Sequence, residues 1–141
     1  MSKYKLPFRP SKKVERVAHK DSPAHFRYGQ RWAIDFNMPE GTKILAARDG
    51  TVVYRRANFS KTYGNAKQAH KCNVVLLKHA DGEISMYGHL KWRSVFPELG
   101  ELVRQGEIIG LSGNVGYSSG PHLHFHVEKP DGTSKRVYFK K

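Results

Sequence analysis

The feature that most constrains the fold is a short alternating stretch near the end of the chain, Gly116-Tyr-Ser-Ser-Gly-Pro-His-Leu-His-Phe-His-Val-Glu128. Its histidines at 122, 124 and 126 alternate with Leu123, Phe125 and Val127. Successive side chains of a β-strand point to opposite faces, so this spacing predicts a strand with three imidazoles on one face. Such a row of imidazoles can hold a metal, transfer protons or form a hydrated surface.

The rest of the chain also consists of short apolar runs between turns, with no pattern typical of a long amphipathic helix. Glycine turns recur, and Asp-Gly pairs at 49–50, 81–82 and 131–132 are typical turn formers. We therefore expect an all-β single domain of about eight or nine short strands, an antiparallel sheet of the barrel-sandwich type. The strands are expected within 14–18, 31–37, 43–47, 51–55, 73–79, 83–90, 107–111 and 122–128, with an exposed loop at 57–71 and a connector at 92–106.

Charge and composition narrow the classes of partner. The 141 residues suit one domain, and the net charge of +13 favours anionic partners such as cell-wall polymers or nucleic acid. No helix-turn-helix, zinc-finger or RNP pattern accompanies the basic residues, so we expect no specific nucleic-acid recognition. Cys72 is the single cysteine, which excludes an internal disulfide and a cysteine-based zinc site. Residues 1–20 are predicted to be a loosely held basic arm, followed by a domain at 21–141.

Asp35 stands out because it lies inside the apolar run Trp32-Ala-Ile-Asp-Phe36 rather than in an Asp-Gly turn. A carboxylate buried there needs a metal ion or an arginine to offset its lost hydration. A catalytic zinc typically has three His, Asp or Glu ligands and an open fourth position. The residues that could supply such a site, without spacing alone assigning their roles, are His25, Asp35, His89, His122, His124 and His126.

Five motifs occur in a fixed order: WAIDF, GTKILAARDGTVV, MYGHL, VRQGEIIGLSGNVGYSSG and PHLHF. Over roughly residues 22–128 this order closely resembles the M23 family of zinc metallopeptidases, the lysostaphin/LytM-type peptidoglycan endopeptidases. The resemblance implies that His25, Asp35 and His124 bind zinc and that His89 and His122 flank the metal-bound water. It also implies a substrate groove walled by loops and lined by Tyr87, Asn114, Tyr117, Ser118 and Ser119, with His126 at its rim.

The chain departs from the family pattern at two positions. The first family motif usually separates its histidine and aspartate by three residues, whereas nine residues separate His25 from Asp35; His19 is the alternative first ligand. His126 occupies a position where relatives often carry glutamate or an apolar residue. The spacing from Gly116 to Glu128 also fits the first half of a cupin motif, but the 13 residues that follow leave no room for the second half.

The resemblance therefore implies a zinc metalloendopeptidase that cleaves peptide stems or cross-bridges of bacterial peptidoglycan. The alternative is a non-catalytic, LytM-like regulator that binds the cell wall. No apolar run is long enough to span a membrane, and the N-terminal residues do not resemble a signal peptide. We expect a monomer that acts at the cell wall, and both a secreted enzyme and a phage-type lysin are compatible with the sequence.

Overall fold

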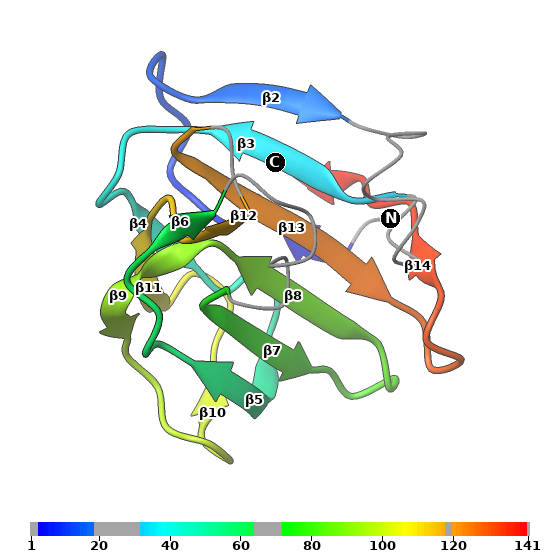
Figure 1. Cartoon of the computed structure of the whole chain (residues 1–141). Coiled ribbons are helices and arrows are strands. Elements are labelled where there is room, and N and C mark those ends of the chain that lie inside the picture. Colours follow the sequence, from blue (N-terminus) through cyan, green and yellow to red (C-terminus); the bar gives the residue numbers. More distant parts are fainter. Residues whose placement is uncertain (1–2, 19–31, 64–71, 118–119, 141) are drawn as a thin grey trace.

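The computed structural model describes residues 3–18, 32–63, 72–117 and 120–140. Every regular element in these ranges is a strand, so the prediction of an all-β fold is confirmed. Figure 1 shows the strands wrapped around one core, without a helix in the described residues. Accordingly, none of the described residues forms a helix that is long and apolar enough to cross a membrane.

A large twisted sheet carries the histidine strand near its centre (Figure 1). Neighbouring strands of this sheet are hydrogen-bonded and antiparallel throughout. Outside the main order, β14 (Ser134–Lys135) pairs with the histidine strand β13 (His122–Glu128). The order across the sheet is β10 (Leu102–Val103), β5 (Gly50–Arg56), β7 (Val74–Lys78), β8 (Ile84–Gly88), β13 (His122–Glu128), β3 (Ile34–Asn37) and β2 (Glu15–Ala18).

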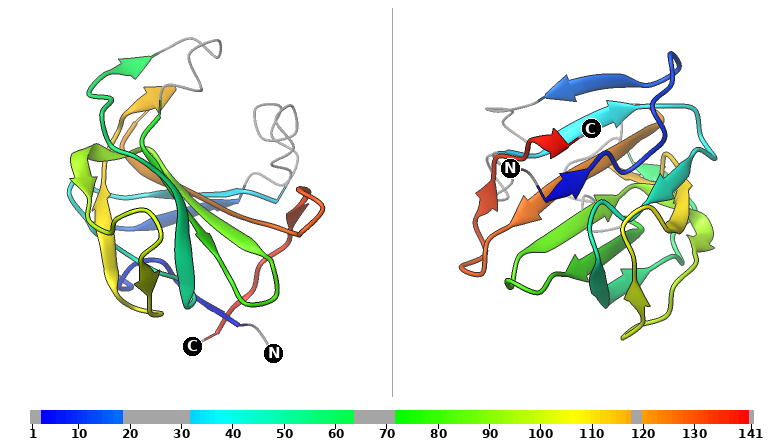
Figure 2. Two further views of the ribbon diagram at one scale, coloured as in Figure 1. Left: turned by 90° about the horizontal axis from the view of Figure 1, so that it is seen from below. Right: turned by 180° about the vertical axis from the view of Figure 1, so that it is seen from behind.

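Three smaller sheets complete the fold. The three-stranded sheet packs across the large one and consists of β4 (Lys43–Leu45), β11 (Ile108–Ser112) and β9 (Leu90–Val95). The two remaining pairs are parallel: β1 (Tyr4–Lys5) with β15 (Phe139–Lys140), and β6 (Thr62–Tyr63) with β12 (Gly116–Tyr117). In Figure 2 the paired strands β1 and β15 lie on one side of the molecule, and β6 and β12 lie on the other.

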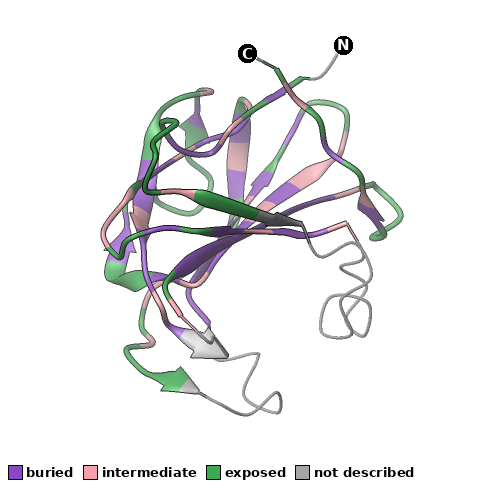
Figure 3. Cartoon of the chain, turned by 90° about the horizontal axis from the view of Figure 1, so that it is seen from above, coloured by how far each residue is buried: buried purple, intermediate pink, exposed green. Residues whose placement is uncertain are grey.

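The core lies between the large sheet and the three-stranded sheet. Phe36, Leu123 and Phe125 are at most 1% exposed, and they meet Ile44 and Ile109 from the smaller sheet in one apolar cluster. Figure 3 shows this burial concentrated in the central strands, while exposed residues occupy edges and turns. Apolar side chains thus bury one face of β3 and β13, which fixes the register and turns Asp35 and the histidines to the opposite face.

Residues 3–18, the described part of the predicted basic arm, belong to the domain, so the prediction of a loosely held arm is wrong for them. Tyr4 and Phe8 are 3% and 6% exposed and join the apolar cluster. β2 pairs with β3 along four residues, and the backbone N–H of Lys5 donates to the carbonyl of Ala47 at 2.8 Å. Lys3, Lys5, Lys12 and Lys13 are exposed. The basic composition of this segment therefore gave no indication of the few apolar residues that are buried.

Two strands occur where a connector was expected. β9 covers Leu90–Val95 and β10 covers Leu102–Val103. Leu90 and Val95 are buried, but between them Lys91, Trp92 and Arg93 are all exposed, which breaks the alternation expected of a strand. Arg93 has a positive φ of 57°, which explains the break because this conformation interrupts the pleat.

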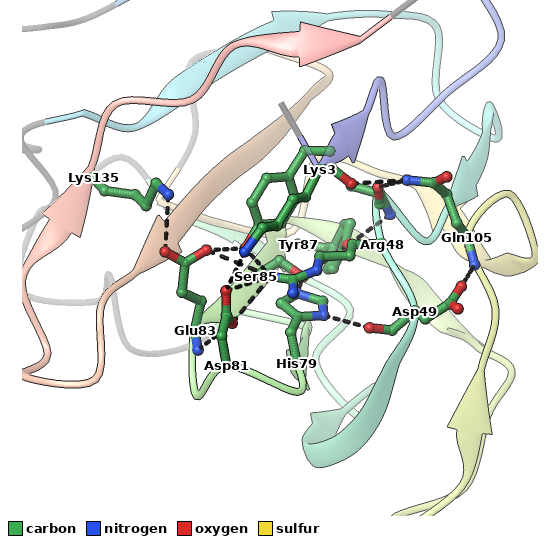
Figure 4. Close-up of polar contacts among 12 residues, drawn as sticks. Lys3, Arg48, Asp49, His79, Asp81, Glu83, Ser85, Tyr87, Gln105 and Lys135 are labelled. Carbon is green, nitrogen blue, oxygen red and sulfur yellow. Dashed lines mark hydrogen bonds and ion pairs between the residues drawn. The ribbon is translucent and has the colours of Figure 1, made fainter. Parts of the chain in front are cut away.

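A chain of buried polar groups crosses the core face of β8 (Figure 4). His79 Nδ1 donates to the carbonyl of Asp49 (2.7 Å), so its Nε2 accepts from the Ser85 hydroxyl (2.9 Å). The Tyr87 hydroxyl donates to Ser85 Oγ (2.9 Å) and accepts from the N–H of Ala47 (2.9 Å). Each side-chain nitrogen and oxygen of His79, Ser85 and Tyr87 therefore has a hydrogen-bond partner within the protein.

Candidate active site

The histidine face of β13 meets Asp35 directly. In the register between β13 and β3, His124 lies opposite Asp35 and His122 lies opposite Asn37. Asp35 Oδ1 is 3.4 Å from His124 Nδ1 and 3.8 Å from His122 Nε2. One carboxylate oxygen and two imidazole nitrogens, which come from two strands, therefore converge within 4 Å.

His89 joins this group from the junction of β8 and β9. Its φ of 61° is left-handed, a conformation uncommon for residues other than glycine and frequent at functional sites. The turn brings the His89 ring to 4.4 Å from the His122 ring and 6.1 Å from the His124 ring, measured between centroids. The structure thus brings together four of the five residues predicted to bind metal or act beside it.

Backbone carbonyls orient two of these imidazoles. His89 Nδ1 donates to the carbonyl of Val115 (2.7 Å), and His122 Nδ1 donates to the carbonyl of Gly120 (2.8 Å). In a neutral imidazole with the proton on Nδ1, the lone pair is on Nε2. Both rings therefore present a basic nitrogen, and His122 Nε2 faces Asp35.

Burial keeps His89 neutral. Desolvation, followed by the neighbouring His122 and His124, lowers the pKa of His89 to about 3, although Val115 and Asp35 act in the opposite direction. His89 is therefore uncharged at ordinary pH, and its Nε2 lone pair can accept a hydrogen bond.

Gly88 pairs with His124 across β8 and β13. A Cβ added to Gly88 would lie 3.4 Å from His124 Cβ, an ordinary van der Waals contact, and 3.3 Å from the flexible end of the Met86 side chain. A small residue at this position therefore packs directly against the backbone end of His124.

The donor set at Asp35 and His124 fits a metal ion. A carboxylate oxygen and an imidazole nitrogen are both ordinary ligands of zinc and related metals, and a three-ligand site needs one more. His25 and His19, the two predicted sources of that ligand, lie outside the described residues. Among the residues that are described, no group of three His, Cys, Asp or Glu side chains has metal-binding geometry.

Two predictions about the groove are wrong. Tyr87 has no exposed surface and lies on the core face, where its ring packs against Phe125 at 5.3 Å between centroids. His126 is on the histidine face as predicted, but it is only 2% exposed and is not a rim residue. Its ring lies behind His124, with His126 Nδ1 at 3.0 Å from His124 Nε2.

The remaining groove residues stay predictions. Asn114 is half-buried, and its carbonyl accepts a hydrogen bond from the Thr62 hydroxyl, which links β6 to the start of β12. Tyr117 lies in β12, and its side chain is outside what the structure describes, as are Ser118 and Ser119.

Sequence reasoning assigned no role in the site to Cys72 or Glu128. Cys72 is buried beside His89, and its sulfur accepts the His89 backbone N–H at 3.0 Å. Burial raises the pKa of the Cys72 thiol to about 11, so this contact involves the neutral thiol. Glu128 lies two residues beyond His126 on the same strand face, and this spacing was the available signal.

Comparison with known proteins agrees with this site. The profile of Peptidase family M23 matches residues 29–137. A protein of Buchnera aphidicola described as an uncharacterized metalloprotease is 37% identical over 84% of this chain and 30% of its own length. The peptidoglycan DD-endopeptidase ShyA of Vibrio cholerae is 34% identical over 66% of this chain and 19% of its own length.

A solved structure agrees as well. The catalytic domain of the antimicrobial peptidase lysostaphin from Staphylococcus simulans superposes with a TM-score of 0.63. It is 27% identical and covers 87% of this chain and 88% of that domain. The fold and the site thus define a β-sheet metallopeptidase domain. The chain belongs to Peptidase family M23, and it spans less than a third of the length of the two curated relatives.

Proposed function

We propose that this chain is a zinc-dependent endopeptidase that hydrolyses peptide bonds in bacterial peptidoglycan. The observation that carries the proposal is the convergence of Asp35, His122 and His124 within 4 Å, with His89 beside them. The family is one of metallopeptidases, and ShyA is by name a peptidoglycan endopeptidase.

Asp35 and His124 would hold the zinc ion, with His25 as the third ligand. When bound, zinc would polarise the scissile carbonyl and lower the pKa of a water molecule towards neutrality. The Nδ1 hydrogen bonds to Val115 and Gly120 hold the His89 and His122 rings in place, so each Nε2 can accept or return a proton at a fixed position. Once its Nε2 has accepted a proton, His122 can also donate a hydrogen bond to the oxyanion that develops on the substrate.

We further propose that the substrate is a peptide stem or cross-bridge and that the protein acts as a monomer at the cell wall. The net charge of +13 favours an anionic surface and would mainly raise the rate of encounter. Such steering weakens as salt shortens the range of electrostatic attraction, so turnover of sacculi should fall between about 10 and 150 mM salt. Turnover that is independent of ionic strength would contradict the steering proposal.

The direct test combines metal analysis with hydrolysis of purified sacculi. The wild type should bind about one zinc ion and release soluble peptide fragments. Asp35→Asn should lose both properties. The matched control, Asp131→Asn, changes an exposed aspartate in the Lys129–Thr133 turn and should keep both.

Other outcomes would point to other functions. A zinc-free wild type that binds sacculi and releases no fragments when zinc is added would support the non-catalytic regulator. Tight, sequence-independent DNA binding at physiological salt without wall hydrolysis would indicate a nucleic-acid protein instead. Retention of zinc and activity by His25→Ala would refute His25 as a ligand and direct attention to His19.

A further inference from the structure

We propose that His126 and Glu128 are positioning residues that fix the ring and the tautomer of the metal ligand His124. This inference rests on the proposed function, because it concerns the metal that Asp35 and His124 would hold. It assigns a role to a histidine that is buried, lies on the same face as the site and takes no direct part in the chemistry described above.

The three side chains form a continuous hydrogen-bonded line along β13. His124 Nε2 lies 3.0 Å from His126 Nδ1, and His126 Nε2 lies 3.1 Å from Glu128 Oε1. The two imidazole planes are nearly perpendicular, at 84°, with their centroids 5.2 Å apart. Residues i, i+2 and i+4 of a strand share one face, so the strand itself supplies this alignment.

The proton positions follow from the carboxylate. An ionised Glu128 can only accept, so His126 carries its proton on Nε2. Neutral His126 then has its lone pair on Nδ1 and accepts the proton of His124 Nε2. His124 is left with its lone pair on Nδ1, and this nitrogen lies 3.4 Å from Asp35 Oδ1, where the metal would be shared.

Burial differs between the middle and the outer end of this line. His126 is 2% exposed, whereas the Glu128 side chain is 35% exposed. Across the sheet, His126 pairs with Met86, whose thioether is at most a weak acceptor. The carboxylate therefore keeps partial hydration, and it polarises a buried imidazole that contacts the ligand.

Partners of this kind hold metal-bound histidines in many proteins, and losing one typically weakens metal affinity about 10–100-fold. We expect that loss for His126→Leu, which keeps an apolar side chain of similar size in the buried position but cannot accept from His124 Nε2. Glu128→Gln keeps an acceptor for His126 but removes the charge, so its loss should be smaller. Glu98→Gln, at an exposed turn, is the matched control and should behave as the wild type.

Two measurements on the purified domain test the proposal. The first is the zinc dissociation constant, obtained by competition with a chromophoric chelator. The second is the tautomer of His124 in the metal-free protein, read from long-range ¹H–¹⁵N NMR correlations. The wild type should show protonated Nε2 at His124, and His126→Leu should show a mixture of tautomers; a role in packing alone would not change this signal.

The outcomes separate this inference from the proposed function. Zinc affinity within about threefold of wild type in His126→Leu, together with an unchanged tautomer, would overturn the positioning role even if the enzyme is active. A threefold change in affinity is well below the roughly 10–100-fold loss expected when such a partner is removed. A wild type that binds no zinc would overturn the positioning role and the proposed function together. Weakened zinc binding in both variants, with unchanged urea stability of the metal-free protein, is the expected result.

Discussion

The large sheet carries hydrogen-bonded histidines on both of its faces, and the two groups differ in what their nitrogens contact. On the core face, His79 is linked through Ser85 to Tyr87, and the chain ends at the backbone N–H of Ala47. On the other face, His89 and His122 each give one nitrogen to a backbone carbonyl, and the rings converge beside Asp35.

This difference separates a structural histidine from a candidate catalytic one. Both ring nitrogens of His79 form hydrogen bonds within the protein. Burial is the largest influence on the pKa of His79 and lowers it, so this side chain remains a neutral link in the core. The pKa of His89 is also lowered, to about 3, yet its ring lies 4.4 Å from the His122 ring and 6.1 Å from the His124 ring, measured between centroids. A perturbed pKa therefore does not identify the site; the groups that lie beside each ring do.

The largest effect should follow from His124→Ala. His124 is a proposed metal ligand, and its loss would remove the polarisation of the substrate carbonyl, which contributes several kcal/mol, so sacculus hydrolysis should fall at least about 1000-fold. Metal content measured after dialysis should fall in parallel. Substantial hydrolysis by His124→Ala would remove the distinction between the two faces.

The next largest effect should follow from His89→Ala or His122→Ala. Loss of a general acid or base typically lowers kcat by about 10²–10⁴-fold. Because neither residue is a proposed ligand, zinc should stay bound within a few-fold of wild-type affinity. Loss of zinc in either variant would instead make that residue a ligand, and would change the division of roles on this face.

Tyr87→Phe should affect the core face alone. The Ala47 N–H and the Ser85 hydroxyl would each lose a partner in a buried position, which should lower the free energy of unfolding by about 1–3 kcal/mol. Urea denaturation measures this loss, and kcat/KM on sacculi should stay unchanged. A lower kcat/KM with unchanged stability would show that Tyr87 reaches the substrate after all.

The smallest effect concerns the acid sensitivity of the fold, through the carboxylate of Asp81. Partial burial would raise the pKa of Asp81, but the N–H of Glu83 and the cations Lys3 and Arg48 lower it to about 2. A carboxylate with a depressed pKa stabilises the fold above its unfolded pKa of about 3.9 and loses that contribution as the pH falls towards 2. Urea midpoints should therefore decline across this window.

The variant Arg48→Met tests whether Asp81 causes this pH dependence. Arg48 donates to both Asp81 carboxylate oxygens at 3.1 Å, so its removal should flatten the pH dependence of the urea midpoint between pH 4 and 2. An equally steep decline in this variant would assign the acid sensitivity to other carboxylates, such as Glu83, which Lys135 contacts at 2.8 Å.

Much of the fold was predictable because it depends on local alternation. The spacing around His124 placed three imidazoles on one face, and the apolar run around Asp35 placed a lone carboxylate in a strand. Both features depend on the two-residue period of a strand, and the structure contains both. Strand order was not predictable in the same way, because β13 pairs with β3 and β8, which are distant in the sequence.

The errors have a common physical cause. Alternation shows which residues share a face but not what covers that face. His126 has the spacing of a site residue, and it is buried by neighbours that only the assembled sheet supplies. Tyr87 was assigned from the family resemblance, yet its register opposite Phe125 places it in the core. Tyr4 and Phe8 are isolated among lysines and arginines, so no periodic signal revealed their burial.

The pairing of β1 with β15 has a practical consequence. Phe139 in β15 packs against Phe36 and Phe125, so both strands lie on the apolar side of the sheet, opposite His122 and His124. A tether or a fused partner attached beyond either strand would leave from that side (Figure 2). The domain could thus be anchored by either end to a bead or a carrier protein with its histidines facing outward.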